Sequence, residues 1–391
     1  MNFDFLYTIP WNEIPSYVYA IYGIFLLCTL IQLHYYLVQH RKVAGFTPKA
    51  DQMRSEQPPV SIVMCARNEQ HNLEKNLPLF LKQDYPQFEV VVVNNCSTDE
   101  SEMLLYNLRR YHSNLQVTSI EQNGKFMHDK KLAITVGIKA ARYETIIFTE
   151  PDCAPGNEKW LSAMQQAFGD AGEVVISYCR SKRRSGISEK IMRCDSVFSA
   201  LFSLRAAIKG APYRSTIKNM GMNQAFFFSK KGFAHYNSYP QSEETIFLCR
   251  NANRYNTRVT LARDAILSSS QQLTFGQWFQ QKCIYASLLD MGKRGKKRIG
   301  VEMASRVLFY LCAAMLISIA ALWHDYFLFF GIAPLLLFRL AAQVAIFVKA
   351  TKKLQERGII IWLLLYDIFS PALALVIGMA QPNLQKIKKI K

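Results

Sequence analysis

The chain is poor in acidic residues and lacks the paired cysteines of common metal-binding motifs. Its 391 residues include 29 Asp and Glu against 47 Lys and Arg, which gives a formal net charge of +18 at pH 7. None of its nine cysteines forms a Cys-x-x-Cys pair, and most lie in a segment where we expect thiols to stay reduced. The sequence therefore predicts neither disulfides nor a zinc site. It also contains no nucleic-acid-binding motif, so we expect no nucleic-acid partner.

The N-terminal part lacks the basic start and the small-residue cleavage site of a secretory signal. It does contain an apolar run, residues 17–38, about as long as the ~20 residues that a helix needs to cross a bilayer. We therefore expect residues 1–40 to be a retained N-terminal transmembrane anchor.

Three more apolar segments follow near the other end, at residues 304–323, 326–348 and 359–380. They predict C-terminal transmembrane helices within residues 301–391, and the alternative is that they are core helices of a large soluble protein. Ser370-Pro371 interrupts the last segment. A full crossing and a re-entrant hairpin that returns the basic tail to the starting side are both compatible with this pattern.

Basic residues gather beside the apolar segments. Examples are Arg41, Lys42, the run at 293–298, Lys349 and Lys352. Lys and Arg next to spans stay on the cytoplasmic side, so we expect an integral protein of the plasma or inner membrane with residues 58–265 as a cytoplasmic domain. Anionic lipid headgroups attract basic residues by roughly 1 kcal/mol each, so a role at the membrane surface is enough to explain the excess of basic residues.

Strand and helix patterns alternate between the membrane segments. The apolar runs VSIVMC and EVVVV each end in polar residues and precede a helical pattern. Such alternation predicts an α/β fold with a mostly parallel sheet, in which ligands bind at the carboxyl ends of the strands. The polar tips of the runs lie at these ends.

Five motifs in this domain resemble those of glycosyltransferase family 2. In order, they are SIVMCARNE, VVVVNNCSTDES, FTEPDCAP, MGMNQAFFFSKKGF and QSEETIFLCR. The resemblance implies a Rossmann-like nucleotide-diphospho-sugar transferase domain that inverts the configuration at the anomeric carbon of the transferred sugar.

Glu150 and Asp152 follow an apolar strand pattern. Carboxylate oxygens suit Mg²⁺ or Mn²⁺, which can neutralise the charge that develops on a departing diphosphate. The resemblance assigns Asp152 to this divalent metal and Glu150 to the metal or the donor ribose. The alternative is a solvated acidic turn.

Donor-binding residues are implied on two loops. Asn94 and Asn95 stand where the family often carries aspartates that meet the nucleotide base and ribose, and an amide can still donate and accept hydrogen bonds there. Ala66, Asn68 and Glu69 belong to the same implied pocket, although Glu69 also suits the first turn of a helix.

Lys130 and Lys131 match a position where the family places a basic residue near the donor diphosphate. An ammonium group is a suitable point charge for phosphate. The alternative is that both are solvated charges on a helix.

Glu243 and Glu244 match the family's acidic pair, and Glu244 takes the position of the catalytic base. Inversion requires a base opposite the leaving nucleotide, to accept the proton of the acceptor hydroxyl. Two acids at a helix start also suit the helix dipole without any catalysis. Gly221 and Asn223 resemble the family's acceptor-side strand and turn.

Beyond residue 265 the resemblance weakens. Residues 266–300 mix aromatic and polar side chains before a basic run, which predicts an interfacial amphipathic segment. Gln281, Lys282 and Tyr285 stand at places related to the Q-x-x-R-W motif of polysaccharide-making members, without its Arg-Trp.

These observations predict a metal-dependent glycosyltransferase that uses a nucleotide-sugar donor. We expect its acceptor to be a lipid-linked or membrane-proximal glycan. The alternatives are a processive polysaccharide synthase and a catalytically inactive membrane scaffold or nucleotide-sugar sensor.

Overall fold

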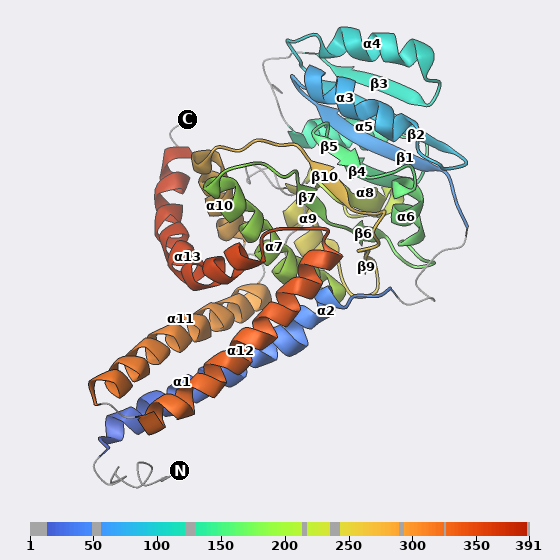
Figure 1. The fold of residues 1–391 in the computed structure, drawn as a ribbon. Helices are drawn as coiled ribbons and strands as arrows, with labels where there is room; N and C mark the ends of the chain where they lie inside the picture. Colours follow the sequence, from blue (N-terminus) through green and yellow to red (C-terminus); the bar gives the residue numbers. More distant parts are fainter. Residues whose placement is uncertain are drawn as a thin grey trace.

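The computed structural model describes residues 14–48, 56–121, 130–212, 217–234, 243–288, 293–323 and 326–388. These residues form an α/β domain joined to a group of long helices, as Figure 1 shows. The strands are β1 (Val60–Ala66), β2 (Phe88–Asn95), β3 (Leu115–Ile120), β4 (Thr145–Thr149), β5 (Cys153–Pro155), β6 (Val174–Ile176), β7 (Cys179–Ser181), β8 (Met220–Asn223), β9 (Thr257–Val259) and β10 (Leu267–Ser269).

The larger sheet has seven strands in the order β3-β2-β1-β4-β8-β6-β9, and a smaller sheet has the order β5-β10-β7. Strands β1 to β4 run parallel, whereas β8 runs antiparallel to both β4 and β6. The predicted α/β fold with a mostly parallel sheet is confirmed. Because β1, β2 and β4 are in parallel register, their carboxyl ends meet at one edge of the sheet.

Helices cover both faces of the sheet and extend below it in Figure 1. In the α/β domain they are α3 (Gln70–Leu81), α4 (Ser101–Tyr111), α5 (Lys130–Ala140), α6 (Trp160–Gln166), α7 (Ile187–Ile208), the 3₁₀ turn η5 (Ile217–Asn219), α8 (Gln224–Ser229) and α9 (Glu243–Asn251). Gly137 lets α5 lie close to the sheet, since a Cβ there would meet Val63 Cγ1 at 2.6 Å.

Side chains of β1 alternate between two apolar cores. Ile62 and Met64 pack in the core on one face, and Val63 packs in the core on the other. The second core also contains Phe347 and Leu363 from the long helices. The α/β domain and the long helices therefore share an apolar core.

Four helices are long and apolar enough to cross a membrane: Ser16–Ala44, Ile299–Leu322, Leu328–Lys353 and Ile360–Ala380. They belong to α1 (Ser16–His34) with η3 (Tyr35–His40) and α2 (Arg41–Ala44), α11 (Lys293–Leu322), α12 (Tyr326–Lys353) and α13 (Ile360–Lys388), and α10 (Phe275–Leu288) precedes them. In Figure 1, α1, α11 and α12 lie side by side. Leu30, Leu311 and Leu337 on these helices are 57%, 56% and 65% exposed, as expected of side chains that face lipid.

The last helix, α13, leaves this bundle. In Figure 1 it curves away from α12, packs against α7 and ends beside α10. It also continues through Ser370-Pro371, where we expected a break. Pro371 lacks the N–H that would bond to the Asp367 carbonyl, and the Ser370 hydroxyl donates to that carbonyl instead, at 3.1 Å. The proline therefore bends the segment without interrupting it.

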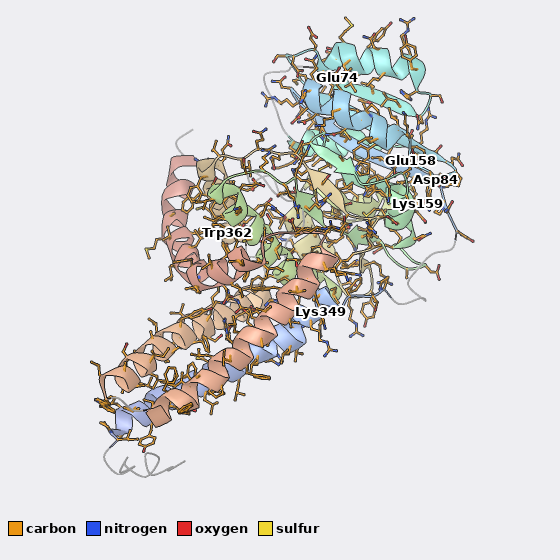
Figure 2. The ribbon with its side chains drawn as sticks, viewed as in Figure 1. Glu74, Asp84, Glu158, Lys159, Lys349 and Trp362 are labelled. Atoms are coloured by element: carbon orange, nitrogen blue, oxygen red, sulfur yellow. The ribbon has the colours of Figure 1, made fainter. Side chains whose placement is uncertain are left out.

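A buried ionic network ties the long helices to α7. Glu302 on α11 accepts from Arg205 of α7 at 3.2 Å and lies 3.3 Å from Arg306. Asp367 on α13 pairs with Arg306 at 3.1 Å and with Arg339 of α12 at 2.7 Å. Charges within a membrane segment need partners, and here each partner comes from another helix or from the next turn. Lys190 of α7 adds a further contact, since its ammonium lies 4.8 Å from the ring centre of Trp362 on α13, a residue that Figure 2 labels.

Candidate active site

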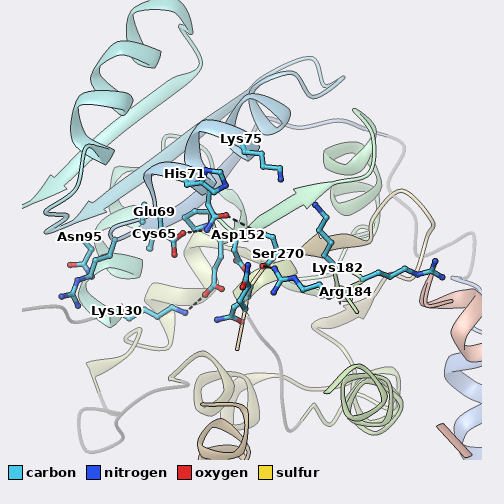
Figure 3. A pocket seen from close by; sticks show the side chains of 18 residues that line it. Cys65, Glu69, His71, Lys75, Asn95, Lys130, Asp152, Lys182, Arg184 and Ser270 are labelled. Atoms are coloured by element: carbon cyan, nitrogen blue, oxygen red, sulfur yellow. Dashed lines mark hydrogen bonds and ion pairs between the residues drawn. The ribbon is translucent and has the colours of Figure 1, made fainter. Parts of the chain in front are cut away.

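A large cavity opens at the carboxyl edge of the larger sheet. This cavity, cavity A, measures about 890 Å³ and is lined by the ends of β1, β2 and β4, the start of α3 and the segments after β7 and β10. Figure 3 shows the polar side chains that surround it. It lies where parallel α/β sheets bind their ligands.

Two carboxylates of cavity A meet two ammonium groups, those of Lys130 and Lys218. Glu150 and Asp152 follow β4, as the sequence predicted. Lys130 Nζ donates to Glu150 Oε1 at 2.6 Å, while Lys218 Nζ lies 2.6 Å from Asp152 Oδ2 and 3.4 Å from Glu150 Oε2. The four charges balance one another.

This balance shifts the pKa values of the groups involved. Burial alone would raise the pKa of Glu150, but Lys130 and Lys218 outweigh it and lower the pKa to about 2. Burial would lower the pKa of Lys218, and the carboxylates of Glu150 and Asp152 raise it above its usual range instead. Glu150 and Lys218 are therefore charged at neutral pH.

The predicted donor-binding residues separate into two groups. Ala66, Glu69 and Asn95 line cavity A. Asn95 is 7% exposed, and its Oδ1 has no hydrogen-bond partner among the described residues. Burial is the main reason why the pKa of Glu69 is raised, and the negative charges of the neighbouring Asp152 and Glu150 raise it further.

Asn68 and Asn94 do not line the cavity and instead hold its loops together. Asn68 adopts a positive φ of 54°, and its Oδ1 accepts the Thr98 N–H at 2.7 Å. The Oδ1 of Asn94 accepts the Ser97 N–H at 3.3 Å. Asn68 therefore connects the loop after β1 with the loop after β2, and Asn94 holds the start of the latter loop against the end of β2.

The two predicted lysines of α5 also differ. Lys130 lines cavity A and a second cavity, cavity B, whereas Lys131 lines neither. Cavity B measures about 300 Å³ and meets cavity A at Lys130 and Glu150. It extends from the sheet toward α7 and α10.

Glu244 lies in the wall of cavity B, beside the carboxylate and lysine groups described above. It is 6% exposed and belongs to the first turn of α9. Gln281 of α10 lines the same cavity. The side chain of Glu243 lies outside the described part of the chain.

Gly221 and Asn223 lie away from these cavities. Gly221 sits in the middle of β8, where a Cβ would meet the Phe168 ring at 2.7 Å. Asn223 pairs with Thr145, the first residue of β4, and so lies at the opposite edge of the sheet. Because β8 is antiparallel, it is the turn before its start that reaches the site, through Lys218, two residues before Met220.

Sequence reasoning missed Lys218 and a basic rim of cavity A. The rim consists of Arg67, His71, Lys75, Lys182, Arg183 and Arg184. Figure 3 shows Lys75, Lys182 and Arg184 around the opening. The run of three basic residues at 182–184 was the available signal, and such a rim suits an anionic ligand.

The acid pair can accommodate a divalent cation. Hard cations take one or two carboxylates together with phosphate oxygens and water, and the carboxylates here border a cavity large enough for a diphosphate. In the part of the chain that the structure describes, no group of three or more His, Cys, Asp and Glu side chains is arranged around one metal position. Phosphate oxygens of a bound ligand would have to complete the coordination.

A third cavity, cavity C, adjoins cavity B and is mostly apolar. It measures about 240 Å³ and lies between α7, α10, α11 and α13. Asp195, Ser199, Lys282 and Tyr285 line both cavities. Asp195 holds this boundary together, since it pairs with Lys282 and accepts from Trp278 Nε1 at 3.2 Å.

The sheet, its polar carboxyl edge and the acid pair define the class of α/β glycosyltransferases with a nucleotide-diphospho-sugar transferase fold. The family described as Glycosyl transferase family 2 matches residues 61–234, which make up most of the α/β domain.

Two curated relatives are similar over part of this domain. Glycosyltransferase AglE from Haloferax volcanii is 30% identical over 112 residues, which are 28% of this chain and 35% of the relative. Poly-beta-1,6-N-acetyl-D-glucosamine synthase from Staphylococcus epidermidis is 26% identical over 93 residues, 24% of this chain and 21% of the relative. The matches therefore span about a third and a fifth of the two relatives.

A solved structure is similar over most of the chain. Mannosyltransferase PcManGT from Pyrobaculum calidifontis, determined in complex with GDP-Man and Mn²⁺, superposes with a TM-score of 0.55. The superposition covers 86% of this chain and 99% of that chain at 16% sequence identity. At this identity the likeness establishes the shared fold.

Proposed function

We propose that this protein is an inverting glycosyltransferase that moves a sugar from a nucleotide-sugar donor to a lipid-linked acceptor at the membrane surface. One observation carries the proposal. Glu244, Glu150, Lys130 and Lys218 line cavity B, which connects the polar cavity A with the apolar cavity C. A donor, a base and an acceptor would meet there.

The donor would occupy cavity A. The buried amide of Asn95 can meet the nucleotide base or ribose, and Glu69 lies on the same wall. The basic rim and Lys130 supply positive charge for the diphosphate. GDP-Man in the PcManGT complex supports a nucleotide-sugar donor for this fold, without naming the sugar used here.

Asp152 and Glu150 would hold Mg²⁺ or Mn²⁺ together with the donor phosphates. When bound, such an ion neutralises negative charge on the departing diphosphate. Lys130 forms an ion pair with Glu150, and its ammonium group would stabilise the same developing charge.

Glu244 would act as the catalytic base. A carboxylate in the wall of cavity B can accept the proton of an acceptor hydroxyl that enters from the side of cavity C. The sugar carbon would then be attacked opposite the departing nucleotide, which inverts its configuration.

The apolar cavity C supports a lipid-linked acceptor. It is lined by Phe198, Ile299, Met303, Leu373 and Ile377 and lies among helices that could cross a membrane. A hydrocarbon chain would gain roughly 25 cal/mol for each Å² of apolar surface removed from water. A free soluble glycan would gain nothing comparable from this lining.

We further propose that the catalytic domain faces the cytoplasm of the plasma or inner membrane. The basic residues Arg41, Lys42 and Lys352 belong to the ends of α2 and α12, which lie beside the α/β domain in Figure 1. Figure 2 labels Lys349 at the same level. Basic residues near spans favour the cytoplasmic side.

A second candidate function is processive polysaccharide synthesis. It is favoured by Gln281, which lines cavity B at a position related to the Q-x-x-R-W motif, and by the synthase among the relatives. The product separates the two functions, because a synthase releases a long polymer and the proposed transferase yields a lipid with a short glycan. A catalytically inactive scaffold or sensor would bind the donor without turnover.

The test uses the purified full chain in detergent with a panel of nucleotide sugars and Mg²⁺ or Mn²⁺. We expect one donor to release its nucleoside diphosphate, with at least a hundredfold loss in Asp152→Ala and Glu244→Gln, in the range of general acid–base contributions. Glu102→Gln, on the exposed face of α4, is the matched control and should keep full turnover. Donor binding without turnover by the wild type would favour the scaffold.

A further inference from the structure

Lys218 occupies the position between the two carboxylates where a divalent cation would bind. Its ammonium lies 2.6 Å from Asp152 Oδ2, 3.4 Å from Glu150 Oε2, and 3.0 Å from both Ser269 Oγ and Gln271 Oε1. Two carboxylate and two neutral oxygens thus surround one positive charge. A hard divalent cation prefers this same set of ligands.

The surroundings hold this arrangement in place. The Lys218 side chain is 16% exposed and that of Asp152 is 9% exposed. The Ser269 hydroxyl also donates to Asp152 Oδ2, and the Ser270 N–H donates to the Asp152 carbonyl at 2.8 Å. The segment after β10 therefore fixes Asp152 and Lys218 together.

A divalent cation and Lys218 cannot share Asp152 Oδ2. An ion bound there would lie next to a like charge, in a partly buried position where screening by water is weak. Lys218 would have to leave Asp152 first. Its long flexible stem permits this movement, and the phosphates of a donor in cavity A would offer the ammonium a new partner.

We propose that Lys218 makes metal binding at Asp152 depend on the donor diphosphate. Without donor, Lys218 neutralises the carboxylates and keeps metal affinity low. With donor, the phosphates attract Lys218 and add oxygen ligands for the metal, so both bind more tightly, by the same factor in each direction. This inference rests on the proposed metal-assisted use of a nucleotide sugar.

The experiment measures Mn²⁺ binding to the full chain in detergent, from the electron paramagnetic resonance signal of free Mn²⁺. We expect Lys218→Gln to bind Mn²⁺ about tenfold more tightly than the wild type without nucleotide, within the usual range of coupling between sites. UDP or GDP should tighten Mn²⁺ binding to the wild type by at least the same factor, and should tighten it less in Lys218→Gln.

Two variants control for charge and folding. Lys218→Arg keeps the positive charge and should bind Mn²⁺ as the wild type does. Lys139→Gln removes an exposed charge from the far end of α5, away from the carboxylates, and it should also match the wild type in the absence of nucleotide. Thermal unfolding of each variant checks that the fold is intact.

Equal Mn²⁺ affinity of Lys218→Gln and wild type without nucleotide would overturn the proposal. Absence of Mn²⁺ binding in every protein, even with UDP or GDP, would overturn it as well. A separate assay of sugar transfer tests the proposed function. If transfer continues in EDTA but is lost in Glu244→Gln, the protein is a glycosyltransferase that needs no metal, and the proposal for Lys218 is overturned.

Discussion

Glu356 anchors the turn between α12 and α13 to the catalytic domain, and its removal provides a stringent test of the structure. Its carboxylate accepts two hydrogen bonds from the Arg193 guanidinium of α7, the one from Nε at 3.2 Å, and one from Tyr178 Oη at 3.3 Å. The side chains of Glu356 and Arg193 are 1% and 6% exposed. Glu356→Ala would leave a buried guanidinium whose remaining hydrogen-bond partner among the described residues is the Arg357 carbonyl, at 3.2 Å.

The expected cost follows from this burial. Breaking a buried ion pair by removing one partner costs about 3–5 kcal/mol, because the other charge stays buried without compensation. At about 2 °C per kcal/mol for a large domain, the unfolding temperature should fall by roughly 6–10 °C. Glu356→Gln keeps an oxygen acceptor and should cost about 1.5–3 kcal/mol, the value of hydrogen bonds to a charged group.

The assay is thermal unfolding of the purified chain in detergent. Arg193→Met combined with Glu356→Leu removes both charges and should recover most of the loss, since apolar pairs often replace buried ion pairs without cost. Glu102→Ala on the surface should change the unfolding temperature by less than about 1 °C. A Glu356→Ala protein as stable as this surface control would refute the reasoning.

Three further predictions concern the site and its surroundings. Gly378→Phe should slow transfer to a lipid acceptor at least tenfold while donor hydrolysis continues. Gly378 lines cavity C and a Cβ there meets nothing within 4 Å, so the Phe ring would fit and occupy the space of the acceptor. The rate of transfer is measured by extracting the lipid product. Glu150 has a pKa of about 2 in the folded chain against 4.5 when unperturbed, and this difference corresponds to about 3 kcal/mol of folding stability. This stability is present above pH 4.5 and lost as the pH falls toward 2, and Glu150→Gln should remove that part of the pH dependence of unfolding. Burial raises the pKa of Cys65 to about 12, so at pH 8 it should react with iodoacetamide roughly a thousandfold more slowly than a free thiol, as mass spectrometry can measure.

Each of these predictions has a matched control or a contradicting result. Met379→Phe changes the neighbouring residue, which is 70% exposed and does not line cavity C, so it should leave transfer to lipid unchanged. An acid-unfolding profile that is the same with and without the Glu150 carboxylate would contradict the second prediction. Rapid labelling of Cys65 would contradict the third.

Local patterns predicted the sheet well. The β-branched run at residues 60–65 could only be a buried strand, and the polar residues after it had to lie at the edge of the sheet. The direction of the strands alone predicted that the residues after them lie close together. In the structure, Glu69, Asn95, Glu150 and Asp152 do line one cavity. The long apolar segments were equally clear, since their length is set by the thickness of a bilayer.

Long-range pairing could not be predicted from such patterns. Lys218 reaches the acid pair because β8 is antiparallel, and the sequence near it has no signal for strand direction. The same reversal carries Asn223 to the far edge. Likewise, the Ser370 hydroxyl compensates for Pro371, so a proline that predicted a break lies within a continuous helix.

The partners of buried charges are set by tertiary structure as well. Asp367 is a single acid in an apolar segment, and nothing in its neighbourhood indicates that Arg306 and Arg339 meet it. Helix packing brings them together, and packing depends on side chains far apart in the sequence.

Transfer of labelled sugar to extracted membrane lipids tests the central claim most directly. The wild type, given its donor and Mg²⁺ or Mn²⁺, should produce label that partitions into organic solvent, and Glu244→Gln should bind the donor but yield no such label. Glu102→Gln should behave as the wild type. Label found only in a water-soluble polymer, or lipid labelling that persists in Glu244→Gln, would contradict the account.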